Sequence, residues 1–99
     1  MTGHTRDSVA LRITRAEDTD PGRITLGVEG RLVAEAVGVL ERECRRSLEE
    51  APKVRLDFSG VTFIDGRGVE MLRRIGARRL QVVNCSAFVE HLLYGAGDP

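Results

Sequence analysis

Apolar residues alternate with polar ones in four short stretches of the chain, which is the period of a β-strand packed on one face. The alternating residues are Val9, Leu11 and Ile13; Ile24, Leu26 and Val28; Val54, Leu56 and Phe58; and Leu80, Val82 and Val83. Pro21-Gly22 lies between the first two stretches and predicts a turn there. We therefore expect the first two strands to form an antiparallel hairpin.

Three further stretches have the spacing of amphipathic helices. The first begins at Leu32 and ends before Pro52, with Val33, Ala36, Val37, Leu40, Cys44 and Leu48 on its apolar stripe and Glu41-Arg45, Arg45-Glu49 and Arg46-Glu50 spaced for ion pairs. The second follows Asp65 and reaches about Ala77, and the third follows Ser86. Asp65 and Ser86 are both residue types that cap helix N-termini.

The element order is therefore β-β-α-β-α-β-α. It predicts an α/β fold in which helices pack on a single-layer, mixed four-stranded sheet, with parallel strands on either side of each crossover helix. We expect one domain over residues 8–94, with flexible termini at 1–7 and 95–99.

The stretch from Val54 to Gly68 organises the rest of the chain. Ser59-Gly60 is expected to interrupt the third strand, and a second apolar run leads to a loop tip at Asp65 to Gly68. At about 100° per residue, Val69, Leu72 and Gly76 are predicted to centre the buried side of the second helix. Arg67, Arg74 and Arg78 then lie opposite, with Met71 near them on the exposed side.

This stretch resembles the signature of the STAS domain (sulfate transporter and anti-sigma factor antagonist), an apolar strand followed by Asp-Ser-Ser/Thr-Gly-Leu at the start of a helix. Asp65 and Gly68 match, Val69 replaces the leucine, and Gly66 and Arg67 replace the two hydroxyl residues. The resemblance runs from about Val9 to Leu93. It implies a bacterial-type SpoIIAA-like fold.

In STAS anti-sigma factor antagonists, the first hydroxyl residue after the aspartate is phosphorylated by an anti-sigma factor kinase. Gly66 occupies that position and has no hydroxyl. The resemblance therefore implies a degenerate phosphosite with no phosphoacceptor. Ser59 and Thr62 lie nearby, and modification of either in place of residue 66 stays open.

The resemblance implies a non-catalytic protein-interaction module. We expect it to dock a partner through the Asp65–Gly68 loop and the second helix, and the predicted contact residues are Asp65, Gly66, Arg67, Met71 and Arg74. The partner would be an anti-sigma factor, another signalling subunit, or a subunit of an ABC-type lipid transporter. Two alternatives remain: a sensor that binds a small anion or nucleotide on the N–H groups of Arg67 and Gly68, and a domain with only a structural role.

The composition mainly excludes classes of function. Lys+Arg and Asp+Glu number 15 each, and the three Phe and one Tyr are not interleaved with arginines, so we expect no binding to nucleic acid. Cys44 and Cys85 lack zinc-ligand spacing and are read as buried small residues, while His4 and His91 have no nucleophile at a suggestive spacing. We expect no metal, cofactor or catalytic residue. Apolar runs are short, which predicts a cytoplasmic protein without membrane insertion.

Overall fold

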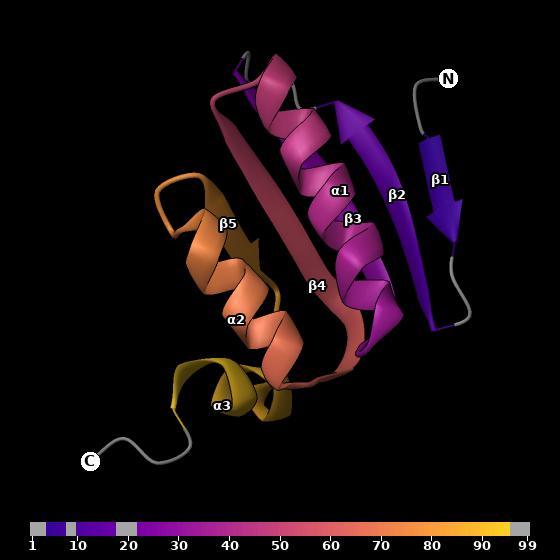
Figure 1. Ribbon diagram of the computed structural model, residues 1–99, viewed down its shortest axis with the longest axis vertical. Helices are drawn as coiled ribbons and strands as arrows, with labels where there is room; N and C mark the ends of the chain where they lie inside the picture. The colour runs from indigo at the N-terminus through magenta and orange to yellow at the C-terminus, as the bar shows by residue number, and fades with distance from the viewer. Residues whose placement is uncertain (1–3, 8–9, 18–21, 96–99) are drawn as a thin grey trace.

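The computed structural model describes residues 4–7, 10–17 and 22–95 and has an α/β fold. A mixed sheet has the strand order β1-β2-β3-β4-β5, and α1 and α2 both lie across one of its faces (Figure 1). The strands are β1 (His4–Asp7), β2 (Leu11–Glu17), β3 (Arg23–Leu32), β4 (Lys53–Ile64) and β5 (Leu80–Val83), and the helices are α1 (Glu35–Glu50), α2 (Gly66–Ile75) and α3 (Ala87–Tyr94). From β2 to α3 this is the predicted succession, so the predicted fold class is confirmed.

The sheet has one strand more than the four that the sequence predicts. β1 pairs antiparallel with β2, with Thr5 opposite Thr14. Its sequence, His-Thr-Arg-Asp, is entirely polar, so no apolar alternation marks it as a strand. Residues 4–7 thus belong to the sheet rather than to a flexible N-terminal segment. Residues 1–3 and 96–99, also expected to be flexible, lie outside the described residues.

The pairing directions of the remaining strands follow the prediction. β2 pairs antiparallel with β3, and β3, β4 and β5 are parallel neighbours. Side chains from the helix-facing side of the sheet and from all three helices form one core, whose fully buried members include Leu26, Leu40, Leu56, Phe58, Met71 and Val89. The crossovers through α1 and α2 place both helices beside each other on that face.

β4 is one continuous strand of 12 residues, so the expected interruption at Ser59-Gly60 is wrong. Its register against β3 shifts by one residue between the pairs Gly27–Asp57 and Glu29–Gly60. The Ser59 N–H donates to Asp57 Oδ1 at 3.0 Å, and this bond is the main reason why the pKa of Asp57 lies below its ordinary value. A bulge therefore absorbs the extra residue without ending the strand.

α1 begins at Glu35 instead of near Leu32, because Leu32 still belongs to β3. The predicted Glu41–Arg45 pair is present at 2.9 Å. Glu50, expected to pair with Arg46, instead receives two hydrogen bonds from Arg15 of β2, at 2.5 and 3.0 Å. This bidentate contact joins the C-terminal end of α1 to the sheet.

The two cysteines differ in burial. Cys44 is fully buried, as expected, and burial raises the pKa of its thiol to about 12. Cys85 is half-buried. Among the described residues, no helix is long and apolar enough to cross a membrane.

Candidate functional site

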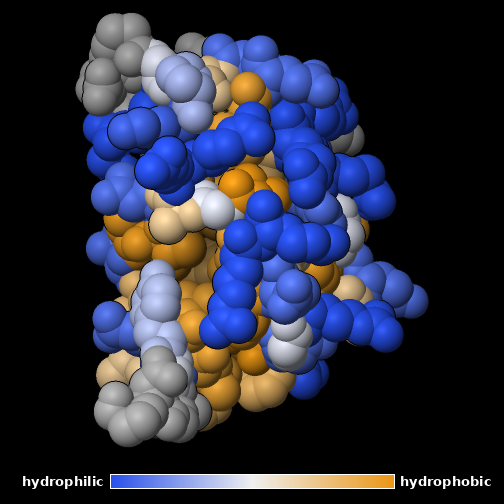
Figure 2. Space-filling model, turned by 60° about the vertical axis from the view of Figure 1, so that its left-hand side comes forward, coloured by the Kyte–Doolittle hydropathy of each residue, from blue (hydrophilic) through white to orange (hydrophobic). Residues whose placement is uncertain are grey.

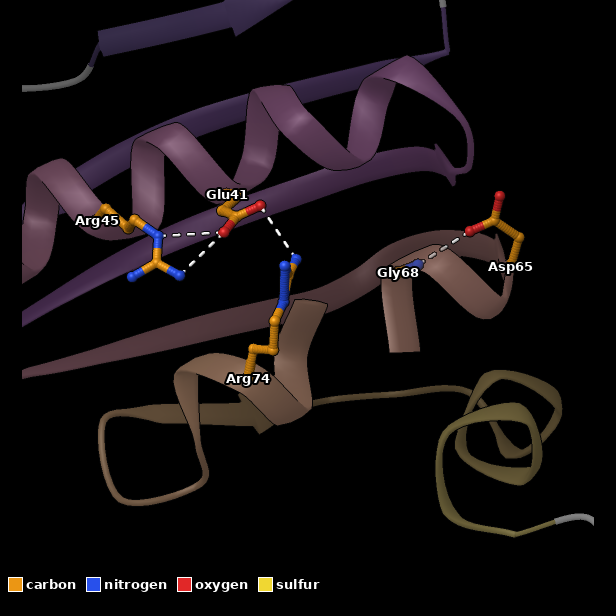
Figure 3. Close-up of polar contacts among 5 residues, drawn as sticks. All are labelled: Glu41, Arg45, Asp65, Gly68 and Arg74. Atoms are coloured by element: carbon orange, nitrogen blue, oxygen red, sulfur yellow. Dashed lines mark hydrogen bonds and ion pairs between the residues drawn. The ribbon is translucent and has the colours of Figure 1, made fainter. Parts of the chain in front are cut away.

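Asp65 lies between β4 and α2 and is the N-cap of α2, as the sequence predicts. Its Oδ1 accepts a hydrogen bond of 2.9 Å from the Gly68 N–H in the first turn (Figure 3). Its Oδ2 accepts a second bond, of 3.0 Å, from the N–H of Ala34 in front of α1. A single carboxylate thus holds the N-terminal ends of two helices.

The loop that leads into α1 depends on this contact. Ala34 has a φ of 51°, in the left-handed region that costs energy for a residue with a side chain. The Asp65 N–H in turn donates to the Leu32 carbonyl at 3.1 Å. These bonds tie the β3–α1 loop to the β4–α2 loop, so the first turns of α1 and α2 lie at the same end of the parallel strands (Figure 1).

Opposing effects set the ionisation of Asp65. Burial raises its pKa, but hydrogen bonds from the backbone N–H groups of Ala34, Gly68 and Arg67, together with the charge of Arg67, lower it to below the ordinary value. The side chain is therefore a carboxylate at neutral pH. The Gly68 N–H, expected to be free for a small anion, donates to this carboxylate instead.

The two glycines of the loop have different environments. Gly66 is exposed, and apart from its chain neighbours and the nearby backbone of α2, no described atom lies within 4 Å of the position that a Cβ would take. At Gly68, a Cβ would lie 2.7 Å from Ile64 Cγ1 and 3.2 Å from Leu32 Cγ. Gly68 is therefore required for the close packing of α2 on the sheet, whereas Gly66 leaves backbone open at the surface.

Substituting alanine at each glycine tests this difference. Gly68→Ala is expected to lower the free energy of unfolding by about 1–2 kcal/mol, because the new methyl group overlaps a packed core. Gly66→Ala, the matched control, is expected to be neutral or to stabilise by up to about 1 kcal/mol, since alanine favours the helix and meets no atom. Urea unfolding of both variants measures the difference. Equal effects would contradict the described packing.

Met71 lies in the core and not on the exposed side of α2, so its predicted role as a contact residue is wrong. Its side chain is 0% exposed. The buried side of α2 consists of Gly68, Met71 and Ile75, whereas Val69 and Leu72 are only half-buried. The predicted buried face of α2 differs from the observed one because Val69 and Leu72 lie in a second apolar environment, beside β5 and α3.

The arginines of α2 remain at the surface. Arg74 is 53% exposed and its guanidinium lies 3.4 Å from Glu41 of α1, whose carboxylate also binds Arg45 (Figure 3). Arg67 is exposed in the first turn. Arg78, predicted to share this face, lies beyond the end of α2 at Ile75. Arg74 thus connects the two helices and still faces solvent.

The first half of α1 and one side of α2 border an open groove of about 510 Å³, which we call the α1–α2 groove. It is lined by Ala34, Glu35, Val37, Gly38, Gly66, Arg67, Glu70 and Arg74. Three of the five predicted contact residues, Gly66, Arg67 and Arg74, therefore share one surface. The α1 residues were missed, although a glycine inside a helix, Gly38, is an unfavourable choice that signals a special position.

The described part of the chain contains no group of three or more His, Cys, Asp or Glu residues that could hold a metal ion. His91 is exposed on α3. The lining of the α1–α2 groove carries charges of both signs, from Arg67 and Arg74 and from Glu35 and Glu70.

A family model described as "Mlab, STAS domain" matches residues 15–97. The chain belongs to the STAS domain family. Domains of this family are generally non-catalytic. The comparison confirms the resemblance inferred from Asp65 and Gly68.

Solved structures show the same fold at low sequence identity. An anti-sigma factor antagonist STAS domain from Rhodobacter sphaeroides has a TM-score of 0.57 and 20% identity, over 77% of this chain and 88% of that one. The anti-sigma factor antagonist SpoIIAA in its unphosphorylated form has a TM-score of 0.59 and 16% identity, over 81% of this chain and 79% of that one. No curated protein matches the sequence.

Proposed function

We infer that this STAS domain is a non-catalytic interaction module that docks a protein partner in the α1–α2 groove. The observation that carries this proposal is Gly66, which is exposed at the groove in the first turn of α2. Apart from its chain neighbours and the backbone of its own helix, no described atom lies within 4 Å of the position that a Cβ would take there. A partner can therefore approach the backbone closely at the position where related antagonists carry a phosphoacceptor.

The charges around the groove favour a partner with an acidic contact residue. Arg67 is the cation next to Gly66, and Arg74 lies further along the same helix. Glu35 and Glu70 also line the groove, so a partner needs charges of both signs in a fixed arrangement. Such matched charges contribute more to specificity and association rate than to affinity.

Phosphorylation does not control this surface at residue 66, because glycine has no hydroxyl. The domain is then constitutively able to bind. Ser59 and Thr62 are exposed but do not line the groove, and Thr62 Oγ1 donates to the Gly30 carbonyl at 3.3 Å. Three partners fit the family: an anti-sigma factor, a subunit of a stress-signalling assembly, and a subunit of an ABC-type lipid transporter.

A bulky residue at position 66 tests the proposal. Gly66→Trp fills the groove from an exposed position without overlapping the core, so it is expected to weaken partner binding about 30-fold or more. Isothermal titration calorimetry against each of the three candidate partners measures the change. Thr14→Trp, on an exposed β2 position of the opposite sheet face, is the matched control and is expected to bind as the wild type does.

Two results would contradict the proposal. One is a partner that binds the wild type and Gly66→Trp equally well. The other is transfer of radiolabelled phosphate from an anti-sigma factor kinase to residues 59–68, which would restore covalent control to this loop.

A further inference from the structure

A second groove lies along α2, on the side of the helix that faces β5 and α3. We call it the β5 groove; its volume is about 440 Å³, which lies in the range of about 300–1,000 Å³ that small-molecule sites occupy. It shares no lining residue with the α1–α2 groove. Figure 2 shows apolar side chains gathered on this side of the molecule. The apolar residues of the lining are Val69, Leu72, Leu80, Val82, Leu93 and Tyr94.

Much of this apolar lining is open to water. Val69, Leu72 and Val82 are half-buried, and Tyr94 is 62% exposed. A single exposed apolar residue is normal on a protein surface, but a hollow that several of them line together is a typical feature of a binding site. An apolar ligand in the β5 groove removes these side chains from water, which favours binding.

The charge at this groove is positive. Arg73 lies among the apolar residues of the lining. Ala77 lines the groove too, and it also lines an adjoining pocket of about 560 Å³ that contains Lys53, Arg78 and Arg79. No carboxylate of the described chain lines either hollow. The Ala77 end of the groove therefore has a positive field that attracts an anionic group.

The arginines at this end of α2 have no internal counterion. Arg74, one residue after Arg73, binds Glu41. Within the described residues, Arg73, Arg78 and Arg79 form no ion pair with a carboxylate. The end of a helix also carries partial negative charge on its last carbonyls. Here the Gly76 carbonyl already accepts bonds from the N–H groups of Arg79 and Leu80, at 3.1 and 3.0 Å. The guanidinium charges therefore dominate.

The edge of β5 favours a ligand that needs no main-chain pairing. β5 has only four residues, Leu-Gln-Val-Val. The Leu80 N–H is already bonded to Gly76 and is not available to a further strand. An added peptide strand obtains its affinity from such main-chain bonds. An acyl chain is recognised by apolar contact alone, which the side chains of the groove provide.

We propose that the β5 groove binds a fatty acid. The acyl chain lies on the apolar lining, and the carboxylate lies on the guanidinium of Arg73 toward the Ala77 end. A carboxylate has two oxygens that the planar guanidinium binds together, as Arg15 and Glu50 show elsewhere in this chain. This site is separate from the α1–α2 groove and does not depend on the partner proposed there.

Tyr94 provides a direct measurement of ligand binding. It is the only tyrosine of the chain, which has no tryptophan, and it lines the groove. Dodecanoate, added to the full chain below the concentration at which it forms micelles, is expected to give a saturable change in tyrosine fluorescence. Isothermal titration calorimetry is expected to give the same dissociation constant and one site per chain. Absence of a saturable change in the fluorescence of Tyr94 overturns the proposal.

The two parts of the ligand are tested separately. Decanoate, which is two methylene groups shorter, is expected to bind about fivefold more weakly, because the open groove covers each methylene only in part. Dodecyltrimethylammonium has the same chain length and a cationic head, and it is expected to bind at least 30-fold more weakly than dodecanoate. Equal affinity for decanoate overturns the placement of the chain. Equal affinity for the cation overturns the role of the arginines.

Charge reversal at Arg73 tests the position of the carboxylate. Arg73 is exposed, so we expect Arg73→Glu to keep the fold and to weaken dodecanoate binding at least tenfold. Arg46→Glu is the matched control, because Arg46 is exposed on α1 and the substitution changes the net charge by the same amount. It is expected to bind as the wild type does. Equal weakening by both substitutions would show that only the net charge attracts the ligand, and this result overturns the site at Arg73.

Discussion

Met71→Ala is expected to lower the free energy of unfolding by about 2–5 kcal/mol. Met71 is 0% exposed and lies on the buried side of α2 with Gly68 and Ile75. Removing most of its side chain costs the transfer of apolar atoms out of water, and it also leaves a cavity that the surrounding residues fill only in part. Urea unfolding followed by circular dichroism measures the change.

Arg74→Ala is the control, on the same helix and one turn away. Its side chain is 53% exposed, and its ion pair with Glu41, at 3.4 Å, lies at the surface, so we expect a loss of about 0–1 kcal/mol. The larger effect at Met71 distinguishes a core position from a docking position. Equal stability of Met71→Ala and the wild type would contradict the orientation of α2.

The orientation of α2 shows where sequence periodicity stops being informative. Two sets of positions have helical spacing: 69, 72 and 76, and 68, 71 and 75. The sequence favours the first set because Val69 and Leu72 are strongly apolar and Gly68 is not. The structure buries the second set, since Gly68 allows the helix to approach the sheet, while α3 and β5 cover Val69 and Leu72 only partly.

The sequence predicts those strands whose side chains are buried on only one face of the sheet. In β2, β3, β4 and β5 the fully buried residues on the helix-facing side are apolar, so alternation predicts these strands. β1 has no such pattern, because its place depends on backbone pairing with β2. The sequence does not show that β4 continues across Ser59-Gly60, because residues that favour turns also occur in β-bulges.

The candidate site was predicted on one helix only. The capping role of Asp65 follows from its place before an apolar helical run, and the exposed position of Gly66 follows from that cap. The second bond of Asp65 leads to the backbone of Ala34, 31 residues earlier. Alanine has no polar side chain, so nothing in the sequence indicates that its backbone N–H binds Asp65. The contribution of α1 to the groove is therefore seen only in the structure.

Asp65→Ala is expected to lower the free energy of unfolding by about 2–3 kcal/mol. The variant loses the hydrogen bond that caps the Gly68 N–H, and removing such an N-cap typically lowers the free energy of unfolding by about 1 kcal/mol. It also loses the charged hydrogen bond that holds Ala34 in its unfavourable φ. Ser86→Ala is the matched control, because Ser86 caps α3 through Val89 alone, at 3.1 Å, and should cost only about 1 kcal/mol.

The pH dependence of this contribution follows from the pKa of Asp65, which lies below its ordinary value of 3.8 in the folded chain. A carboxylate whose pKa is lowered by folding stabilises the fold at pH above the unfolded value, and this stabilisation is lost as the pH falls through the folded value. Asp65→Asn retains one acceptor oxygen but has no charge, so its stability should not share this loss. The wild type should therefore be more stable than Asp65→Asn at neutral pH, and the difference between their free energies of unfolding should shrink as the pH falls below 3.8. A difference that stays constant from neutral to acid pH would show that the charge of Asp65 does not hold the two helix ends together.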